Sequence, residues 1–407
     1  MKRGPSVPVL DAVPSYEAFL ETYLLPNRPV VLPPALVEAW PAFREWASDG
    51  VADWDTLRAK YGEHTVPVVI TTPSGTQHTD MRVDKAVEQI PAIQQEGGSL
   101  YIKDWHLVRG QRGAAPTSMP YWMNNVTSQP THDCASVPYY PDVWLATQHD
   151  AYTQDDFRFC YAGTAGSATP IHRDDTSYSW STNIVGRKRW RLFAPPDAHL
   201  LRRFPGRSTS ETASTYAEME AHRAHDELGQ FRDGKLGWPG WEDARLRVYT
   251  VEQGPGQTIF VPSNWYHEVE NVTDCISLNH NWCNAVNLVS MYNAMEQETD
   301  NVAEALVDVR DMMQDANPSA WQQDFVQVVQ DVVHQDAGWA WDAFWRMVLH
   351  NLQTPPCAPS LRPPAAFVHQ QVRALLTRFA ARPETPWLGA PLHTHLHALQ
   401  QLIGAPA

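Results

Sequence analysis

The sequence predicts a mainly β core with helical additions, and two patterns support this expectation. Between Pro141 and Trp282, short segments rich in β-branched and aromatic residues alternate with Gly, Pro, Asn and Asp. This pattern is typical of a β-sandwich or barrel, a group that includes jelly rolls. After Asn287, apolar residues recur at helical spacing to the end of the chain. A chain of 407 residues can form one large domain with additions, or two domains.

The first hundred residues predict mixed helix and strand. Ser15 can cap a helix over residues 16–23, which Pro26 would end. The other elements expected here are a strand at 29–32, a helix at 54–61, and strands at 65–71 and 99–105.

The central and C-terminal elements follow the two patterns. We expect core strands at 157–162, 177–185, 188–193, 247–250, 258–261, 267–271 and 275–281. The polar stretch 195–243 predicts an insertion that is helical at 210–229. Later helices are expected at 288–315, 319–335, 339–352 and 365–381. The chain therefore divides into N-terminal α/β elements packed on the core (1–140), the β core with its insertion (141–287) and a helical region (288–407).

The charge balance is acidic, with 31 basic and 46 acidic residues and a formal net charge of −15. Such a surface repels phosphate backbones, so we expect no direct nucleic-acid partner, whereas a basic peptide would be attracted. The charge could equally serve only to keep the protein soluble. The N-terminus lacks the apolar core of a signal peptide, and no apolar run approaches ~18 residues. We therefore expect no membrane span and an intracellular location, cytoplasmic with the nucleus as an alternative.

His172 and Asp174 form the first candidate metal-binding pair. They are two residues apart, so on a strand their side chains would point to one face and could meet at one ion. An isolated His-X-Asp pair also arises by chance in a chain with 17 histidines, so the neighbouring residues decide between these interpretations.

His267 is the expected third ligand. It follows a turn that contains a proline, and in the next strand it shares a face with Val269. Glu268 and Glu270 share the opposite face, which as the charged face should be in water. Two histidines and one carboxylate leave coordination positions open, a geometry that suits non-heme Fe(II) and oxygen chemistry.

Lys188 gives the strongest support for this candidate metal site. Period-two alternation places Lys188 on the same side as Trp190 and Leu192, whereas Arg187, Arg189 and Arg191 lie on the other side. Because Trp and Leu mark the buried side, Lys188 should be inside the barrel, where an ammonium needs an anion. A dicarboxylate such as 2-oxoglutarate would supply one. The alternative is a basic run on a solvated face.

Two longer strings carry a family resemblance, FRFCYAGTAGSATPIHRDDTSYSWSTNIVGRKRW and GQTIFVPSNWYHEVENVTDCISLNHNWCNAVN, together with YIKDWHL near residue 101. They resemble the core of the jumonji-C (JmjC) oxygenases over about residues 15–300. The resemblance implies a cupin-like double-stranded β-helix, or jelly roll, and the cofactors Fe(II) and 2-oxoglutarate.

Carried over by residue, the resemblance implies that His172, Asp174 and His267 are the catalytic iron ligands. The cosubstrate residues that it implies are Lys188, Thr169, Tyr101, Asn183, Asn279 and Asn281. In the strand at 275–281, the apolar and the polar residues alternate, and either face could be the inner one. Helices after residue 288 could cover an outer apolar face.

The resemblance further implies a 2-oxoglutarate-dependent dioxygenase that hydroxylates a lysyl side chain of a protein. Its nearest subfamily acts on a translation termination factor, which makes that factor the expected partner besides O2. The alternatives are an N-methyl-lysine demethylase of the same cofactor class, a cupin enzyme that needs no oxo acid, and a non-catalytic metal-binding scaffold. The C-terminal helices could form a homodimer or pack on their own subunit, leaving a monomer.

Overall fold

The computed structural model describes residues 4–38, 40, 42–107, 144, 158–207, 210–222, 237–355 and 357–404. Two antiparallel sheets form the β core, as the turn-punctuated strands predicted. The larger sheet has the order β1-β12-β9-β14-β7-β6-β4-β5, and the smaller has the order β11-β10-β13-β8. The strands of the larger sheet are β1 (Val30–Leu32), β4 (Thr65–Thr72), β5 (Gly75–Arg82), β6 (Ser99–Trp105), β7 (Arg158–Gly163), β9 (Tyr178–Val185), β12 (Thr258–Val261) and β14 (Cys275–Trp282). Those of the smaller sheet are β8 (Ala168–His172), β10 (Lys188–Phe193), β11 (Tyr249–Gln253) and β13 (Tyr266–Asn271).

A small apolar cluster joins the inner faces of the two sheets. Ile259 and Val261 of β12 pack with Trp190 and Leu192 of β10 and with Val269 of β13. Contact between apolar side chains of both sheets excludes water from one end of the sandwich. The polar residues of the candidate site lie on the same inner faces.

The outer face of the larger sheet is covered by aromatic side chains. Trp180 of β9 and Trp282 of β14 are stacked, with ring centroids 5.3 Å apart and an interplanar angle of 10°. They belong to a core cluster that also contains Tyr292, Phe344 and Trp345 of the C-terminal helices. Phe19 of the N-terminal part packs against Trp180 on this face, with ring centroids 5.5 Å apart. The apolar residues of β14 face outward into this cluster, and its asparagines face inward.

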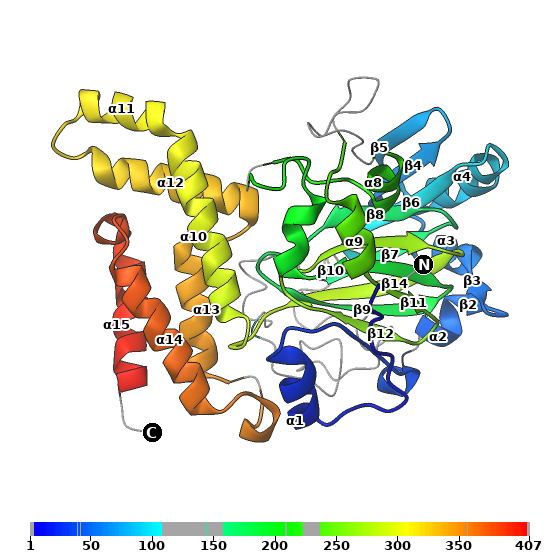
Figure 1. Ribbon diagram of the computed structural model, residues 1–407, viewed down its shortest axis with the longest axis horizontal. Helices are drawn as coiled ribbons and strands as arrows, with labels where there is room; N and C mark the ends of the chain where they lie inside the picture. The colour runs from blue at the N-terminus through cyan, green and yellow to red at the C-terminus, as the bar shows by residue number, and fades with distance from the viewer. Residues whose placement is uncertain are drawn as a thin grey trace.

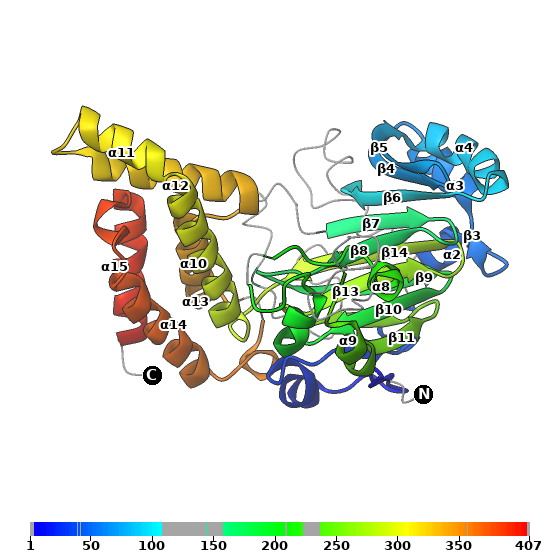
Figure 2. The same ribbon diagram turned by 45° about the horizontal axis from the view of Figure 1, so that its top comes forward.

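The C-terminal helices stand together beside the sheets, and the pair α11–α12 extends away from the core (Figures 1 and 2). They are α10 (Leu288–Ala305), α11 (Val307–Ala316), α12 (Trp321–Ala337), α13 (Trp341–Gln353), α14 (Ala365–Ala380) and α15 (Ala390–Gly404). The sequence patterns predicted this region, although 288–315 divides into two helices and α15 was not singled out. Within the described residues, we find no helix whose length and apolar content would let it cross a membrane.

The N-terminal part begins with α1 (Tyr16–Phe19), which continues as a π-helical turn at Leu20–Leu24. The Ser15 hydroxyl accepts a hydrogen bond from the Ala18 amide at 3.2 Å, so the predicted cap is confirmed. Short elements follow, at α2 (Ala42–Glu45), β2 (Ala47–Ser48), β3 (Val51–Ala52) and α3 (Trp54–Tyr61).

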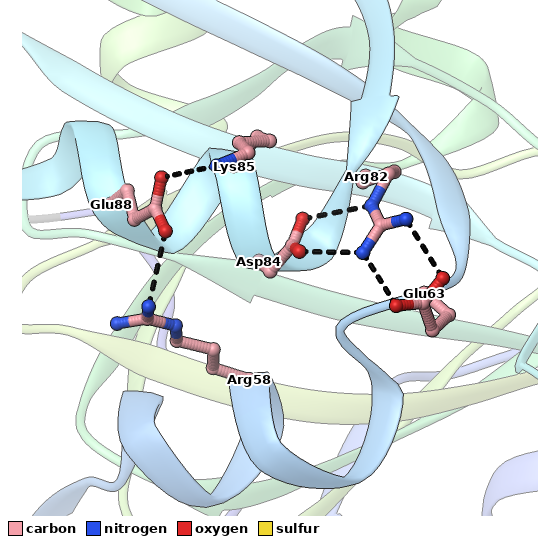
Figure 3. A network of polar contacts seen from close by, with 6 residues as sticks. All are labelled: Arg58, Glu63, Arg82, Asp84, Lys85 and Glu88. Atoms are coloured by element: carbon pink, nitrogen blue, oxygen red, sulfur yellow. Dashed lines mark hydrogen bonds and ion pairs between the residues drawn. The ribbon is translucent and has the colours of Figure 1, made fainter.

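Strand β5 and helix α4 (Val83–Gln95) were not predicted. The residues of β5 are polar and mostly exposed, so the strand lacks the apolar alternation by which strands are recognised. A surface ion-pair network joins α3, α4 and the end of β5, as Figure 3 shows for Arg58, Glu63, Arg82, Asp84, Lys85 and Glu88. Because these groups are exposed, they add little to stability, and the apolar face of α4 holds the helix in place.

Three predictions need correction or lie outside the described residues. The strand expected at 247–250 is wrong at its start, because Arg247 ends helix α9 (Trp241–Arg247) and β11 begins at Tyr249. The insertion contains a 3-10 helix at Pro195–Leu201 and a shorter helix than expected, α8 (Tyr216–Ala221). The expected helical residues 223–229 and the strand residue 157 lie outside the described part of the chain.

The turn between β9 and β10 requires glycine, and this leads to a testable prediction. Gly186 has φ +86°, and a Cβ built there would lie 2.0 Å from the carbonyl oxygen of Asp274. We expect Gly186→Ala to lower the free energy of unfolding by roughly 3 kcal/mol or more, because backbone strain and a steric clash add together. Urea unfolding measures the change.

Gly50 provides the matched control for this substitution. It also has positive φ, at +81°, but no atom lies within 4 Å of its built Cβ. Gly50→Ala should therefore cost only about 1 kcal/mol, the strain of a left-handed alanine. Equal losses for the two variants would contradict the crowding argument.

Candidate metal and cosubstrate site

Two imidazoles lie side by side on the smaller sheet, where its edge strand β8 pairs with β13. His172 ends β8 and pairs in register with His267 of β13, and their ring centroids are 4.2 Å apart. The Nδ1 of His172 lies 2.8 Å from the Pro170 carbonyl oxygen, and the Nδ1 of His267 lies 3.0 Å from that of Trp265. Because a carbonyl only accepts hydrogen bonds, each Nδ1 carries the proton and each Nε2 keeps a free electron pair.

The electrostatics keep His267 neutral. Burial, the adjacent His172 ring and the Trp265 carbonyl all act on this imidazole, and the first two dominate to lower its pKa to about 3. A neutral imidazole is the form that binds a metal ion. The sequence-based prediction that His267 points inward agrees with its exposed fraction of 4%.

The opposite face of β13 only partly matches the prediction that it lies in water. Glu268 is 4% exposed, because its carboxylate accepts a hydrogen bond from the Tyr216 amide of the insertion at 3.0 Å. It also binds Arg191 at 2.7 Å. The insertion therefore covers part of this charged face.

An irregularity in strand pairing brings Thr169 to the same side as His172. Val269 pairs with Thr169 and His267 pairs with His172, so β8 contains one more residue than β13 between these two rungs. A bulge of this kind reverses the side-chain alternation, so two residues three apart share a face. Regular alternation would have placed their side chains on opposite faces.

Asp174 lies beyond the end of β8, so the assumption that it shares a strand face with His172 is wrong. The strand ends at the His172–His267 pair, and the Asp174 carbonyl then accepts a hydrogen bond from the Asn264 amide at 3.0 Å. Burial raises the pKa of Asp174, and the neighbouring His172 opposes that shift. Among the described side chains, no three His, Cys, Asp or Glu residues form a complete metal cluster. The structure thus brings the imidazoles of His172 and His267 together. The Asp174 carboxylate is close enough to His172 for the two groups to interact electrostatically.

Lys188 is buried at the start of β10, with 2% of its surface exposed. Its strand neighbours in register are Asn271 and Gln253, which are neutral. Within the described residues, no carboxylate pairs with this ammonium, and burial lowers the pKa of Lys188 to about 8. The three arginines on the opposite face of this strand form ion pairs with glutamates instead: Arg187, Arg189 and Arg191. The predicted inward orientation of Lys188 is confirmed.

Thr169 and Tyr101 place two hydroxyl groups side by side. The Thr169 hydroxyl donates to the Tyr101 hydroxyl across 3.3 Å, although the two residues belong to different sheets. Both are buried, and burial raises the pKa of Tyr101, so its hydroxyl stays protonated as a possible donor. This pair was predicted from the family resemblance alone.

The three asparagines have different surroundings. Asn279 faces inward and accepts a hydrogen bond from Ser181 at 2.9 Å, and Asn281 pairs in register with Ser179 on the same face. The amide nitrogen of Asn183 donates to the Gly186 carbonyl at 2.7 Å, so it closes the β9–β10 turn. The side-chain oxygen Oδ1 of Asn183 has no hydrogen-bond partner among the described residues.

These residues fit a metal with a dianionic chelator. The imidazole pair provides two free nitrogen electron pairs, and the buried ammonium is a cation without a counter-charge in the described residues. A negatively charged ligand beside Lys188 would remove the cost of burying that ammonium. Neutral ligands would leave it unbalanced.

Asp104 and Tyr161 lie beside this site, and neither was predicted as a site residue. The Tyr161 hydroxyl donates to the Asp104 carboxylate at 2.7 Å. Burial raises the pKa of Tyr161, and the charge of Asp174 raises it further. Burial likewise raises the pKa of Asp174, and the charge of Asp104 adds to that shift. No periodic pattern marks them, because a strand irregularity in β6 brings them together.

The fold and the site define a cupin-like protein. Residues 16–287 match the cupin-like domain family, and the chain belongs to this family, in its JmjC branch. Its match to the 2-oxoglutarate and iron-dependent oxygenase JMJD4 of Homo sapiens is 34% identical over 313 residues, covering 74% of this chain and 67% of that protein.

Two further relatives carry other names. The arginine-specific demethylase JMJ20 of Arabidopsis thaliana is 30% identical over 322 residues, covering 74% of this chain and 62% of that protein. JmjC domain-containing protein 1 of Schizosaccharomyces pombe is 27% identical over 425 residues, covering 86% of this chain and 83% of that protein. The chain thus spans about two thirds of the JMJD4 and JMJ20 relatives and more of the yeast protein.

Proposed function

We propose that this protein is an Fe(II)- and 2-oxoglutarate-dependent oxygenase that hydroxylates a lysyl side chain of a protein. Its cofactors are those for which its JMJD4 relatives are named. His172, Asp174 and His267 would hold the metal, with Asp174 as the carboxylate ligand beside the two imidazoles. The observation that carries the proposal is a buried ammonium without a carboxylate partner in the described residues, on the same inner face as two adjacent imidazoles.

The protein's own residues orient the cosubstrate. Lys188 would attract the distal carboxylate of 2-oxoglutarate, and the hydroxyls of Thr169 and Tyr101 would donate hydrogen bonds to it. Asn183, Asn279 and Asn281 provide further amide groups on the inner face. When bound, Fe(II) and 2-oxoglutarate supply oxygen activation coupled to oxidative decarboxylation of the oxo acid to succinate. The chain contributes position and exclusion of water, so that a substrate C–H bond is oxidised in place.

For the substrate, we propose a lysyl residue of a translation termination factor. The family resemblance supports this choice, and the formal charge of −15 favours a basic target. The second candidate is N-methyl demethylation, which the name of the Arabidopsis relative supports for the same cofactor class. A cytoplasmic location would agree with a substrate in translation.

The test incubates the protein, Fe(II), 2-oxoglutarate and O2 with the termination factor and, separately, with an N-methylated basic peptide. Mass spectrometry of the digests distinguishes the gain of one oxygen atom from the loss of a methyl group. Oxygen gain on a lysyl residue is the expected result. Succinate formation with loss of a methyl group would overturn hydroxylation in favour of demethylation. No oxo-acid turnover with either target would argue for a scaffold or a cupin enzyme of another class.

A further inference from the structure

Strand β6 contains a bulge opposite Tyr161. The pairs Ile102–Ala162 and Trp105–Cys160 enclose two residues of β6, Lys103 and Asp104, but only Tyr161 of β7. Asp104 accordingly has a left-handed backbone, with φ +55°. Two bulge residues opposite one partner face the same side of the sheet, and the Tyr161–Asp104 hydrogen bond confirms this direction for Asp104.

A row of rings runs along the inner face of β6 and β7 beside this carboxylate. Tyr101 and Tyr161 have centroids 5.9 Å apart, Tyr161 and Phe159 are 6.2 Å apart, and Phe159 and His106 are 5.0 Å apart. The row starts at the hydroxyl pair of the cosubstrate site, since Tyr101 contacts Thr169. Faces of aromatic rings attract cations, and an aromatic wall next to a carboxylate suits an alkylammonium or guanidinium group.

The Asp104 carboxylate is open to a ligand. One oxygen is held by the Tyr161 hydroxyl, and the other faces the Lys103 ammonium at 3.7 Å, which is beyond hydrogen-bond distance. The Asp104 side chain is 47% exposed. Its partner Tyr161 packs against Tyr101, whose hydroxyl contacts Thr169, so the carboxylate adjoins the cosubstrate side of the candidate site. A substrate cation could therefore replace the loose contact with Lys103.

We propose that Asp104 and the rings of Tyr161, Phe159 and His106 form the subsite that binds the cationic head of the substrate side chain. This inference rests on the proposed function and specifies it, because it makes a lysyl or arginyl cation the recognised group. Tyr161 orients the carboxylate, and the bulge directs it toward the site. The subsite selects the substrate, whereas the chemistry takes place at the neighbouring metal.

The test uses protein loaded with Mn(II) and 2-oxoglutarate, and two probe peptides. One peptide carries a central lysine between neutral residues, and its twin carries norleucine, which has a similar length but no charge. Paramagnetic broadening of the central side-chain signals reports binding next to the metal. For the wild-type protein, we expect the lysine peptide to bind about tenfold more tightly than its twin, as for a partly buried charged hydrogen bond. Asp104→Asn should remove most of that preference.

Asparagine is chosen because it tolerates a left-handed backbone, so the bulge and its fold are retained. Asp104→Gly is a second variant that also suits φ +55° and removes the side chain altogether. Asp80→Asn, at an exposed position of β5, removes the same charge at another surface and should preserve the preference.

The outcomes separate this inference from the proposed function. If the wild-type protein does not bind Mn(II) and 2-oxoglutarate, the proposed function fails first. If it binds both but the two peptides bind equally, or if Asp104→Asn and Asp104→Gly keep the lysine preference, the cation subsite is wrong while the oxygenase proposal stands. Loss of the preference in Asp80→Asn would show that net charge, and not the subsite, selects the cation.

Discussion

Replacing Lys188 by methionine is expected to abolish 2-oxoglutarate-dependent turnover and, at the same time, to stabilise the folded protein. The ammonium is buried without a carboxylate partner among the described residues, and burial lowers its pKa to about 8. A methionine of similar volume removes the uncompensated charge, which should raise the free energy of unfolding by about 1–4 kcal/mol. Chemical unfolding without cosubstrate measures the stability, and succinate formation measures turnover.

Adding 2-oxoglutarate gives the control for this prediction. A ligand that binds only the folded state raises the melting temperature of the protein. We therefore expect 2-oxoglutarate to raise the melting temperature of the wild-type protein but not that of Lys188→Met. Lys188→Arg keeps the charge and should retain part of that response. A methionine variant that is less stable, or that still responds fully to 2-oxoglutarate, would contradict the assigned role.

The pH dependence of stability provides a further readout. Below about pH 8 the ammonium is protonated in both the folded and the unfolded state, and the folded state bears the full penalty of burial. Between about pH 8 and the usual lysine pKa of 10.5, the unfolded chain binds more protons, so stability rises with pH. This contribution amounts to about 3 kcal/mol. Lys188→Met should lack it.

Substitution of a metal ligand is expected to have the largest effect on activity. His172→Ala, Asp174→Ala and His267→Ala should each lower substrate-dependent succinate formation by at least about 100-fold, since even residues that only support a metal ligand contribute 10- to 100-fold. Metal content after dialysis against Mn(II), measured by atomic absorption, should fall in parallel. The two readouts together show whether activity is lost along with the metal.

The control for the ligand variants is His78→Ala, which changes an exposed histidine of β5 and should leave both readouts unchanged. Asp174→Ala is the most informative variant, because this carboxylate is not assembled with the imidazoles into a complete cluster among the described residues. Full activity in Asp174→Ala or His172→Ala would show that the site is elsewhere.

Local patterns in the sequence determined several features of this protein without reference to the rest of the chain. The alternation around Trp190 placed Lys188 on a buried face, and the helical spacing after residue 288 predicted the C-terminal helices. The hydroxyl of Ser15 predicted the first helix. These features depend on neighbours within one strand or one turn, so a short window of sequence contains the information.

Only the tertiary structure decided the register and the inner faces of the strands. The bulge that brings Thr169 beside His172, and the bulge that directs Asp104 toward Tyr161, arise from pairing with distant strands. The inner face of β14 was decided by the core cluster on its opposite face, to which segments far apart in the chain contribute. Each of these outcomes depends on hydrogen bonds or packing between segments far apart in the chain, and periodicity within one segment carries no record of such partners.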